Sequence, residues 1–281
     1  MQVKIISDST CDLSADLIKK YDIEILPLSV TLGDKVGRDG IEVTPDHIYS
    51  YVSETGMLPK SSALNVSDYE QAFREWTDKG YSVVHFNISS GFSCTHQNAS
   101  IAAADFDNVY VVDSRNLSTG QGLVVIHGAI MAQEGASAEE IYNSCVSIAD
   151  KVEASFVLDE LQYLHKGGRC STVAALGANL LRLKPCIEVR NGSMEVGKKY
   201  RGKIGSVMLE YVSDRLAGRD DICLDRIFLT HTRCNPENIE AVKQKILELQ
   251  PGFKEILHTV AGSTITTHCG PGTMGILFIR K

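Results

Sequence analysis

The sequence predicts an α/β fold in two domains, with a boundary near residue 152. At 281 residues the chain is longer than a single hydrophobic core usually supports, so two domains are favoured over one. Strand and helix patterns alternate over residues 1–152, which is typical of a parallel sheet covered by helices. Over residues 153–281, hairpin signals mix with helices, which indicates an α+β domain.

The first domain begins with a buried strand and continues through alternating elements. We expect strands over residues 3–6, 23–31, 83–88 and 109–112, and helices over residues 15–21, 45–54, 68–79, 123–133 and 138–152. Polar turns follow Ile6, Ile88 and Val112, where three of these strands end. Because ligands collect at the carboxyl ends of parallel strands, we expect these three turns to converge.

The second domain contains a strong hairpin signal. Arg190-Asn-Gly-Ser193 separates two strand-like runs, and an Asn-Gly pair is the preferred centre of a tight hairpin turn. A helix is expected over residues 172–181. The β-branched run Thr264–Thr267 predicts the end of a strand, which would place His268 in a strand-exit loop.

Composition and charge exclude several classes of function. The net charge is −7 and the basic residues are not concentrated on one segment, so nucleic acid is disfavoured as a main partner. The eight cysteines are scattered without a Cys-x-x-Cys pair, which disfavours both a zinc site and a disulfide scaffold. No apolar run is long enough to span a bilayer, and no signal peptide precedes the first strand. We therefore expect a soluble, cytoplasmic protein with reduced thiols.

The turn Ser89-Ser-Gly-Phe-Ser93 lies between a predicted strand and an alanine-rich helix. Free N–H groups at the start of a helix favour an anion, so this turn is a candidate site for a carboxylate or a phosphate. Two other interpretations remain open. Ser93 could simply cap the helix. It could also be the nucleophile of a serine hydrolase of acyl esters, followed in the chain by Asp113 or Asp225 and then by His268.

Two further groups of residues have the chemistry of a binding site. His268 precedes Gly-Pro-Gly, so a rigid turn with small neighbours would leave its imidazole accessible. Arg169 ends Lys-Gly-Gly-Arg and Arg201 ends Lys-Tyr-Arg. Two arginines on turns could bind a phosphate, although basic residues near the end of a helix are also favoured by the helix dipole alone.

The sequence resembles the DegV family of bacterial fatty-acid-binding proteins along its whole length. Seven segments carry the resemblance, in this order: Ser7-Asp-Ser-Thr-Cys-Asp-Leu13, Ile88-Ser-Ser-Gly-Phe-Ser-Cys-Thr95, Val112-Asp-Ser114 with Ser118-Thr-Gly-Gln-Gly122, Leu161-Gln-Tyr-Leu-His-Lys-Gly-Gly-Arg169, Leu183-Lys-Pro185, Lys199-Tyr-Arg201 and Thr267-His-Cys-Gly-Pro-Gly272. The resemblance implies a Rossmann-like parallel-sheet domain over residues 1–152 and an α+β domain with a largely antiparallel sheet over residues 153–281.

The resemblance also implies a function. Members of the family bury a long-chain fatty acid in a tunnel between the domains, and Ser62, Ser93 and His268 match the positions that hold its carboxylate. Arg169 and Arg201 match basic residues for kinase docking and for the acyl phosphate.

A separate fatty acid kinase subunit would supply ATP, so this chain would be a lipid-binding protein without catalytic residues, metal or cofactor of its own. A sensor or scaffold with a structural lipid is the alternative within this class.

Two departures from the family pattern concern the same site. The segment Ser62-Ala-Leu-Asn65 replaces the usual Ser-Gln-Pro-Ser, and Cys94 replaces a glycine. We expect the acyl chain to be lined by the apolar helices after Gly122 and by strands of the second domain.

Overall fold

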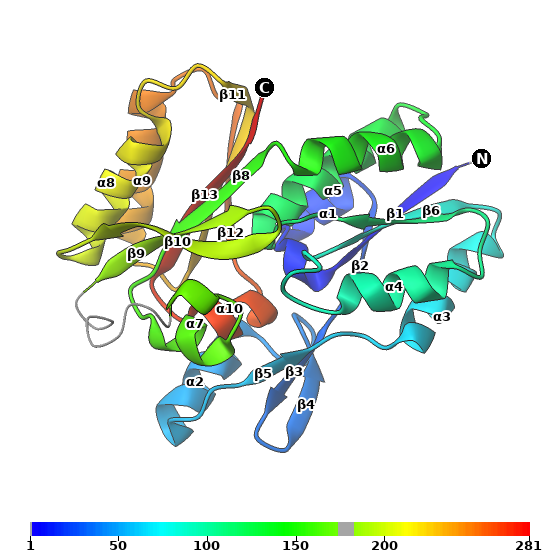
Figure 1. Cartoon of the computed structure of the whole chain (residues 1–281), viewed down its shortest axis with the longest axis horizontal. Coiled ribbons are helices and arrows are strands. Elements are labelled where there is room, and N and C mark those ends of the chain that lie inside the picture. The colour runs from blue at the N-terminus through cyan, green and yellow to red at the C-terminus, as the bar shows by residue number, and fades with distance from the viewer. Residues whose placement is uncertain (1, 174–182) are drawn as a thin grey trace.

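A parallel four-stranded sheet forms the first half of the molecule, in the order β2-β1-β6-β7 (Figure 1). The computed structural model describes residues 2–173 and 183–281. The strands are β1 (Val3–Asp8), β2 (Ile23–Leu26), β6 (Ser82–Asn87) and β7 (Val109–Asp113). Each neighbouring pair is parallel, which confirms the Rossmann-like sheet.

Helices cover both faces of this sheet. One face is covered by α1 (Ala15–Lys20), α5 (Ser118–Gln133) and α6 (Ala138–Ala149), and the other by α3 (Val66–Thr77) and α4 (Thr95–Ala103). A 3₁₀ turn, η1 (Ser9–Cys11), follows β1. The fully buried β6 is the type of strand that a parallel sheet covered on both faces requires.

The second half is built on a six-stranded sheet in the order β10-β9-β8-β13-β11-β12. Its strands are β8 (Val152–Val157), β9 (Lys184–Arg190), β10 (Ser193–Tyr200), β11 (Ile222–Thr232), β12 (Glu255–Val260) and β13 (Thr273–Arg280). The β11–β12 pair is parallel and the other four pairs are antiparallel, so the prediction of a largely antiparallel sheet is confirmed.

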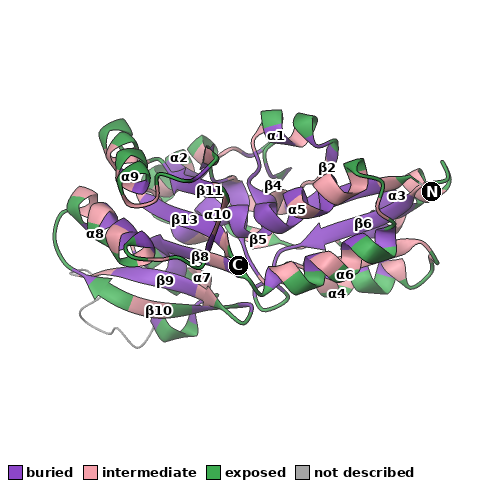
Figure 2. Ribbon diagram, turned by 90° about the horizontal axis from the view of Figure 1, so that it is seen from above, coloured by how far each residue is buried: buried purple, intermediate pink, exposed green. Residues whose placement is uncertain are grey.

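Different helices pack on the two faces of the second sheet. One face is covered by α8 (Ile204–Leu216) and α9 (Pro236–Leu249), whose outer surfaces are exposed in Figure 2. On the other face lie α7 (Gln162–Gly167) and α10 (Ser263–Cys269), side by side in Figure 1. The expected helix over residues 172–181 lies largely outside the described residues.

A third, small sheet in the order β4-β3-β5 lies near α10. It consists of β3 (Ser29–Leu32), β4 (Lys35–Arg38) and β5 (Lys60–Ser62). The helix α2 (Pro45–Thr55) lies between β4 and β5 in the chain. The sequence predicts one strand over residues 23–31, but the chain leaves the first sheet after Leu26. Pro27 has no N–H to donate to a strand ladder, which is consistent with a break at this position.

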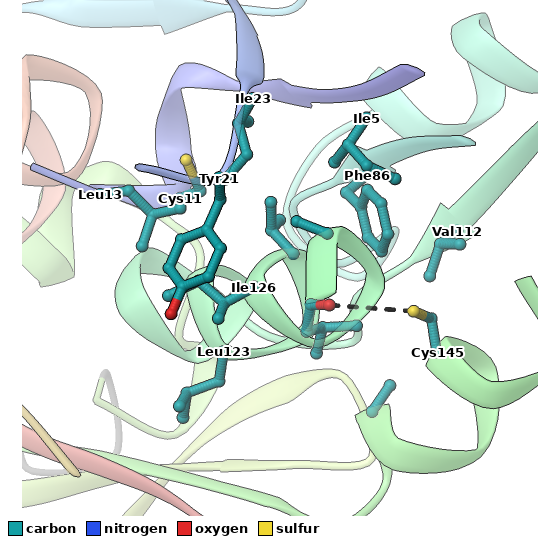
Figure 3. Packing of buried hydrophobic residues seen from close by; sticks show 14 of the residues in the cluster. Ile5, Cys11, Leu13, Tyr21, Ile23, Phe86, Val112, Leu123, Ile126 and Cys145 are labelled. Carbon is teal, nitrogen blue, oxygen red and sulfur yellow. Dashed lines mark hydrogen bonds between the residues drawn. The ribbon is translucent and has the colours of Figure 1, made fainter. Parts of the chain in front are cut away.

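The largest core cluster joins the two main sheets through α5. Residues of α5 such as Leu123 and Ile126 pack against Ile5 and Phe86 of the first sheet, while the same cluster includes Leu277 of the second (Figure 3). Eleven of the sixteen residues of α5 are buried. The helix therefore belongs to the core of both halves.

The prediction of a strand over Thr264–Thr267 is wrong, because these residues form most of α10. The Asp39 carboxylate accepts hydrogen bonds from the backbone N–H groups of Ser263 (2.8 Å) and Thr264 (3.2 Å), which caps the helix. Within the helix, the Thr267 hydroxyl donates to the Ser263 carbonyl at 2.8 Å. These tertiary and local bonds outweigh the preference of β-branched residues for strands.

Within residues 2–173 and 183–281, no helix has both the length and the apolar character needed to cross a bilayer.

Candidate binding site

A cavity of about 270 Å³ lies between elements of both halves. Its lining combines hydroxyl groups, an imidazole and apolar side chains: Thr10, Leu28, Ser61, Ser62, Ala63, Ile88, Phe92, Ser93, Cys94, Leu117, Arg169, Met194, Thr264, Ile265, His268 and Cys269. A smaller cavity of about 30 Å³ adjoins it, since Leu117, Ile265 and Cys269 border both.

The turn after β6 forms one wall of the cavity. Its position is fixed by the neighbouring strand ends: the Ile88 N–H donates to Asp8 Oδ2 at 2.9 Å, and Ser90 Oγ donates to Asp113 Oδ2 at 2.6 Å. The predicted convergence of the three polar turns is therefore confirmed. Burial raises the pKa of Asp8, which is completely enclosed.

Ser93 and Cys94 place the start of α4 at the cavity. Ser93 Oγ accepts a hydrogen bond from the Thr95 N–H at 3.3 Å, and Cys94 is the N-cap residue. The N–H groups of the first turn of a helix have no partners within the helix and attract an anion. Cys94 is exposed and lines the cavity. The turn thus has the polar groups for a carboxylate, with a thiol at its edge.

His268 extends from the last turn of α10 toward β5. Its Nε2 lies 2.7 Å from Ser61 Oγ. The Nδ1 side of the ring packs on Gly167, where a Cβ atom would lie 2.6 Å from Nδ1, so the close approach requires a glycine. Nδ1 has no hydrogen-bond partner within the described part of the chain. We assign the proton to Nε2, which then donates to Ser61 and leaves the Ser61 hydroxyl proton free for a ligand.

The imidazole of His268 is neutral at physiological pH. Its pKa is lowered from 6.5 to about 4, mainly because burial disfavours the imidazolium and secondarily because the Arg169 guanidinium is near. A neutral imidazole with a proton on Nε2 can donate a hydrogen bond to a carboxylate or to a hydroxyl that holds one. The His268–Ser61 pair therefore offers hydrogen bonds, and no positive charge of its own, to a group in the cavity.

Buried carboxyl groups hold the opposite end of α10. Asp12 Oδ1 accepts from the Gly262 N–H at 2.8 Å, and Asp12 Oδ2 accepts from Ser118 Oγ at 2.5 Å. Burial raises the pKa of Asp12 to about 8, although both hydrogen bonds act in the other direction. Asp12 belongs to the loop after β1 and Ser118 to α5, so α10 is anchored to the first half of the molecule.

The structure brings four of the five residues predicted for the site to the cavity. Ser62, Ser93, His268 and Arg169 line it, whereas Arg201 is exposed beyond β10 and is not among the described lining residues. Sequence reasoning missed Ser61, which is the residue that pairs with His268. In the sequence, Ser61 is marked as a candidate only by its position next to Ser62. The roles of these five residues in ligand binding stay predictions.

The helices after Gly122 do not line either of these two cavities in its described parts, whereas strands of the second sheet do, through Phe156, Met194 and Leu277. The lining expected for the acyl chain stays a prediction. Leu117 and Ser118, at the start of α5, reach the cavities, but Leu123, Ile126 and their neighbours fill the core between the sheets. The apolar wall comes instead from residues such as Phe92, Met194 and Ile265.

A hydrolase triad is not assembled among the described residues. The Asp113 carboxylate accepts from Ser90, Asp225 pairs with Lys254, and no carboxylate contacts Nδ1 of His268. A serine hydrolase needs an acid to orient the catalytic histidine. The described residues around His268 therefore lack the Ser-His-Asp arrangement of a serine hydrolase.

Comparison with known proteins places the chain in a family. The family model described as "DegV: Uncharacterised protein, DegV family" matches residues 2–281. The chain belongs to the DegV family. A DegV domain-containing protein of Clostridium acetobutylicum is 31% identical over 100% of this chain and 99% of the relative.

Solved DegV structures share the fold over their full length. A DegV family protein from Thermus thermophilus, described for its fatty acid binding, has a TM-score of 0.90 at 28% identity and covers 100% of both chains. A Thermotoga maritima protein described as revealing a fatty acid binding function has a TM-score of 0.82 at 28% identity and 99% coverage of both chains. A stearic acid-binding protein from Eubacterium ventriosum has a TM-score of 0.81 at 27% identity, covering 100% of this chain and 99% of the other.

Proposed function

We propose that this DegV protein binds a long-chain fatty acid, with the carboxylate held by Ser93, His268 and a serine of β5. The observation that carries the proposal is the neutral His268–Ser61 pair. It opens on the same cavity as the first turn of α4, in a fold shared with fatty-acid-binding relatives. The proposed ligand is therefore an amphiphile with one carboxylate.

Energetic considerations support a division of roles between tail and head. Burying an acyl chain contributes about 0.8 kcal/mol per methylene, so ~14 methylenes contribute roughly 11 kcal/mol before the costs of binding. A hydrogen bond to a charged group contributes about 1.5–3 kcal/mol. Affinity would come mainly from the tail. The polar groups would fix the orientation of the acid, with its carboxylate near Arg169 and Cys94.

The second part of the proposal concerns a partner protein. We propose that the protein presents the carboxylate to the ATP-binding subunit of a cytoplasmic fatty acid kinase and contributes no cofactor or catalytic residue itself. Arg169 lines the cavity and is exposed, and Arg201 is exposed after β10, so both guanidinium groups can contact a partner or an acyl phosphate.

Mass spectrometry of the purified, denatured protein tests the ligand directly. We expect the release of a long-chain fatty acid, and delipidated protein should bind palmitate again. His268→Ala and Ser93→Ala should each weaken palmitate binding by about tenfold, the loss expected for one hydrogen bond to a charged group. A protein that carries no fatty acid and does not bind palmitate would refute the proposal.

Two neighbouring variants decide which serine of β5 contacts the head group. Ser61→Ala should weaken palmitate binding by about tenfold, because it removes the hydroxyl that pairs with His268. Ser62→Ala is the matched variant at the position favoured by the family resemblance. A loss confined to Ser62→Ala would exclude the assignment of Ser61.

A further inference from the structure

The tip of the β9–β10 hairpin contacts the turn that carries Ser93. Ser89 Oγ donates a hydrogen bond to the Gly192 carbonyl at 2.7 Å, across 103 positions in the sequence. Ser89 and Gly192 are both buried. The hairpin belongs to the second sheet and the turn follows β6 of the first, so this contact connects the two halves beside the cavity.

The same side-chain oxygen also fixes the backbone of the turn. Ser89 Oγ accepts from the Gly91 N–H at 3.2 Å, while the Ser89 N–H donates to the Asn116 carbonyl at 2.9 Å. One hydroxyl therefore shapes the turn and attaches it to the hairpin. Removing it would leave the buried Gly192 carbonyl without this donor.

The contact brings two backbones together at a distance that side chains would prevent. A Cβ atom on Gly91 would lie 2.4 Å from the Gly192 carbonyl oxygen, and one on Gly192 would lie 2.8 Å from Ser89 Oγ. Gly192 also has a φ of +77°, in the region that glycine adopts without strain. Both positions therefore need glycine for this approach.

Both sides of the contact lead directly to the cavity. Phe92 and Ser93 follow Gly91, and Met194 lies two residues after Gly192. All three line the cavity, and Phe92 and Met194 belong to one apolar cluster. His268 lies between β12 and β13 of the second sheet. The contact therefore joins the turn that carries Ser93 to the sheet whose strands β12 and β13 flank α10, the helix of His268.

We propose that Ser89 is a positioning residue for the ligand's carboxylate, which acts by fastening the Ser89–Ser93 turn to the β9–β10 hairpin. The inference rests on the proposed function. Ser89 does not line the described cavity, so its effect on binding is transmitted through the alignment of Ser93 and the first turn of α4. A loss of this alignment weakens the recognition of the head group and leaves the burial of the tail in place.

The test compares two probes with the same tail, palmitate and 1-hexadecanol, on the full-length delipidated protein. Ser89→Ala removes the hydrogen bond from the turn. Gly192→Ala disturbs the same contact from the hairpin, because its Cβ atom would lie 2.8 Å from Ser89 Oγ. It provides a second variant for the test if Ser89→Ala does not fold. Ser213→Ala is the matched control, because the Ser213 hydroxyl also donates to a backbone carbonyl, that of Leu209 within α8, and Ser213 does not line the described cavity.

We expect Ser89→Ala and Gly192→Ala to bind palmitate about tenfold more weakly while hexadecanol affinity changes by less than about twofold. Ser213→Ala should bind both probes as the wild type does. Unchanged palmitate affinity in both variants, or an equal loss for both probes, would overturn the role of Ser89. If the wild-type protein binds neither probe, the proposed function itself fails.

Discussion

His268 shows how burial adapts a single residue to its proposed role. Its ring is enclosed by Gly167 on the Nδ1 side and by Ser61 on the Nε2 side. The folded protein keeps this imidazole neutral, with a pKa of about 4, whereas in the unfolded chain the value is near 6.5. Between these two values, the unfolded chain binds a proton that the folded protein does not.

This difference predicts a pH-dependent contribution to stability. As the pH falls from 6.5 to 4, proton uptake by the unfolded chain destabilises the fold, by at most about 3 kcal/mol at 1.36 kcal/mol per pKa unit. His231, with a pKa lowered to about 4, acts in the same direction. Asp12 has the opposite effect on stability. Its pKa is raised to about 8 in the folded protein, so the folded protein holds a proton that the unfolded chain has lost, and acidification stabilises the fold through this group.

Comparison of variants isolates the contribution of His268 to the pH dependence of stability. Urea unfolding of His268→Gln between pH 4 and pH 7 should show a smaller loss of stability on acidification than the wild type. Substitution of the exposed His165 by Gln serves as the control. Parallel pH profiles for the wild type and His268→Gln would contradict the assignment.

At the level of elements, the site depends on α10, a helix that the sequence alone did not reveal. Its N-terminus is capped by Asp39, which is 224 positions away from Ser263 in the sequence. Its C-terminal turn carries His268. The cap thus stabilises the helix that carries His268, the residue proposed to hold the head group.

Removing the cap should therefore affect both stability and binding. Asp39→Ala leaves the buried N–H groups of Ser263 and Thr264 without acceptors, which should cost about 1–3 kcal/mol. We also expect weaker palmitate binding, because α10 loses its anchored position. Urea unfolding and palmitate titration measure the two effects.

A second capped helix provides the control for this prediction. Ser137 caps α6 by accepting from the Glu140 N–H, far from the cavity lining. Ser137→Ala should cost about 1 kcal/mol of stability with no change in palmitate affinity. Retention of full affinity by Asp39→Ala would show that the cap does not position His268.

The sequence predicted features that depend on local pattern. The alternation of strands and helices, the Asn-Gly hairpin and the convergence of polar turns follow from short segments and the geometry of parallel sheets. It did not predict α10, whose cap comes from Asp39. It also did not distinguish Ser61 from Ser62, since β5 has three residues and its register on β3 decides which serine meets His268.

For the whole molecule, α5 couples the two halves. Besides its packing against the first sheet, its Thr119 hydroxyl lies 2.6 Å from that of Thr230 in β11, and a Cβ on Gly120 would lie 3.2 Å from Cβ of Ala154 in β8. One apolar cluster includes residues of both sheets. The two sheets are separate, but their stabilising contacts are shared.

A division of the chain at the predicted domain boundary tests this coupling. A fragment of residues 1–152 should lack a cooperative thermal transition, because one side of α5 would expose apolar surface that the second sheet covers. Circular dichroism during heating and binding of a hydrophobic dye measure this outcome. The full-length chain is the control. A fragment that unfolds in one sharp transition without binding the dye would show that the first half is independently stable.

The cavity wall is drawn from segments that begin at Thr10 and end at Cys269. Ribosomes make the chain from its N-terminus, so α10 is synthesised after every other described segment of this wall. No nascent chain shorter than about 269 residues contains the complete wall. Under the proposed function, bound lipid would therefore report that a molecule contains all of these segments and that they have folded together.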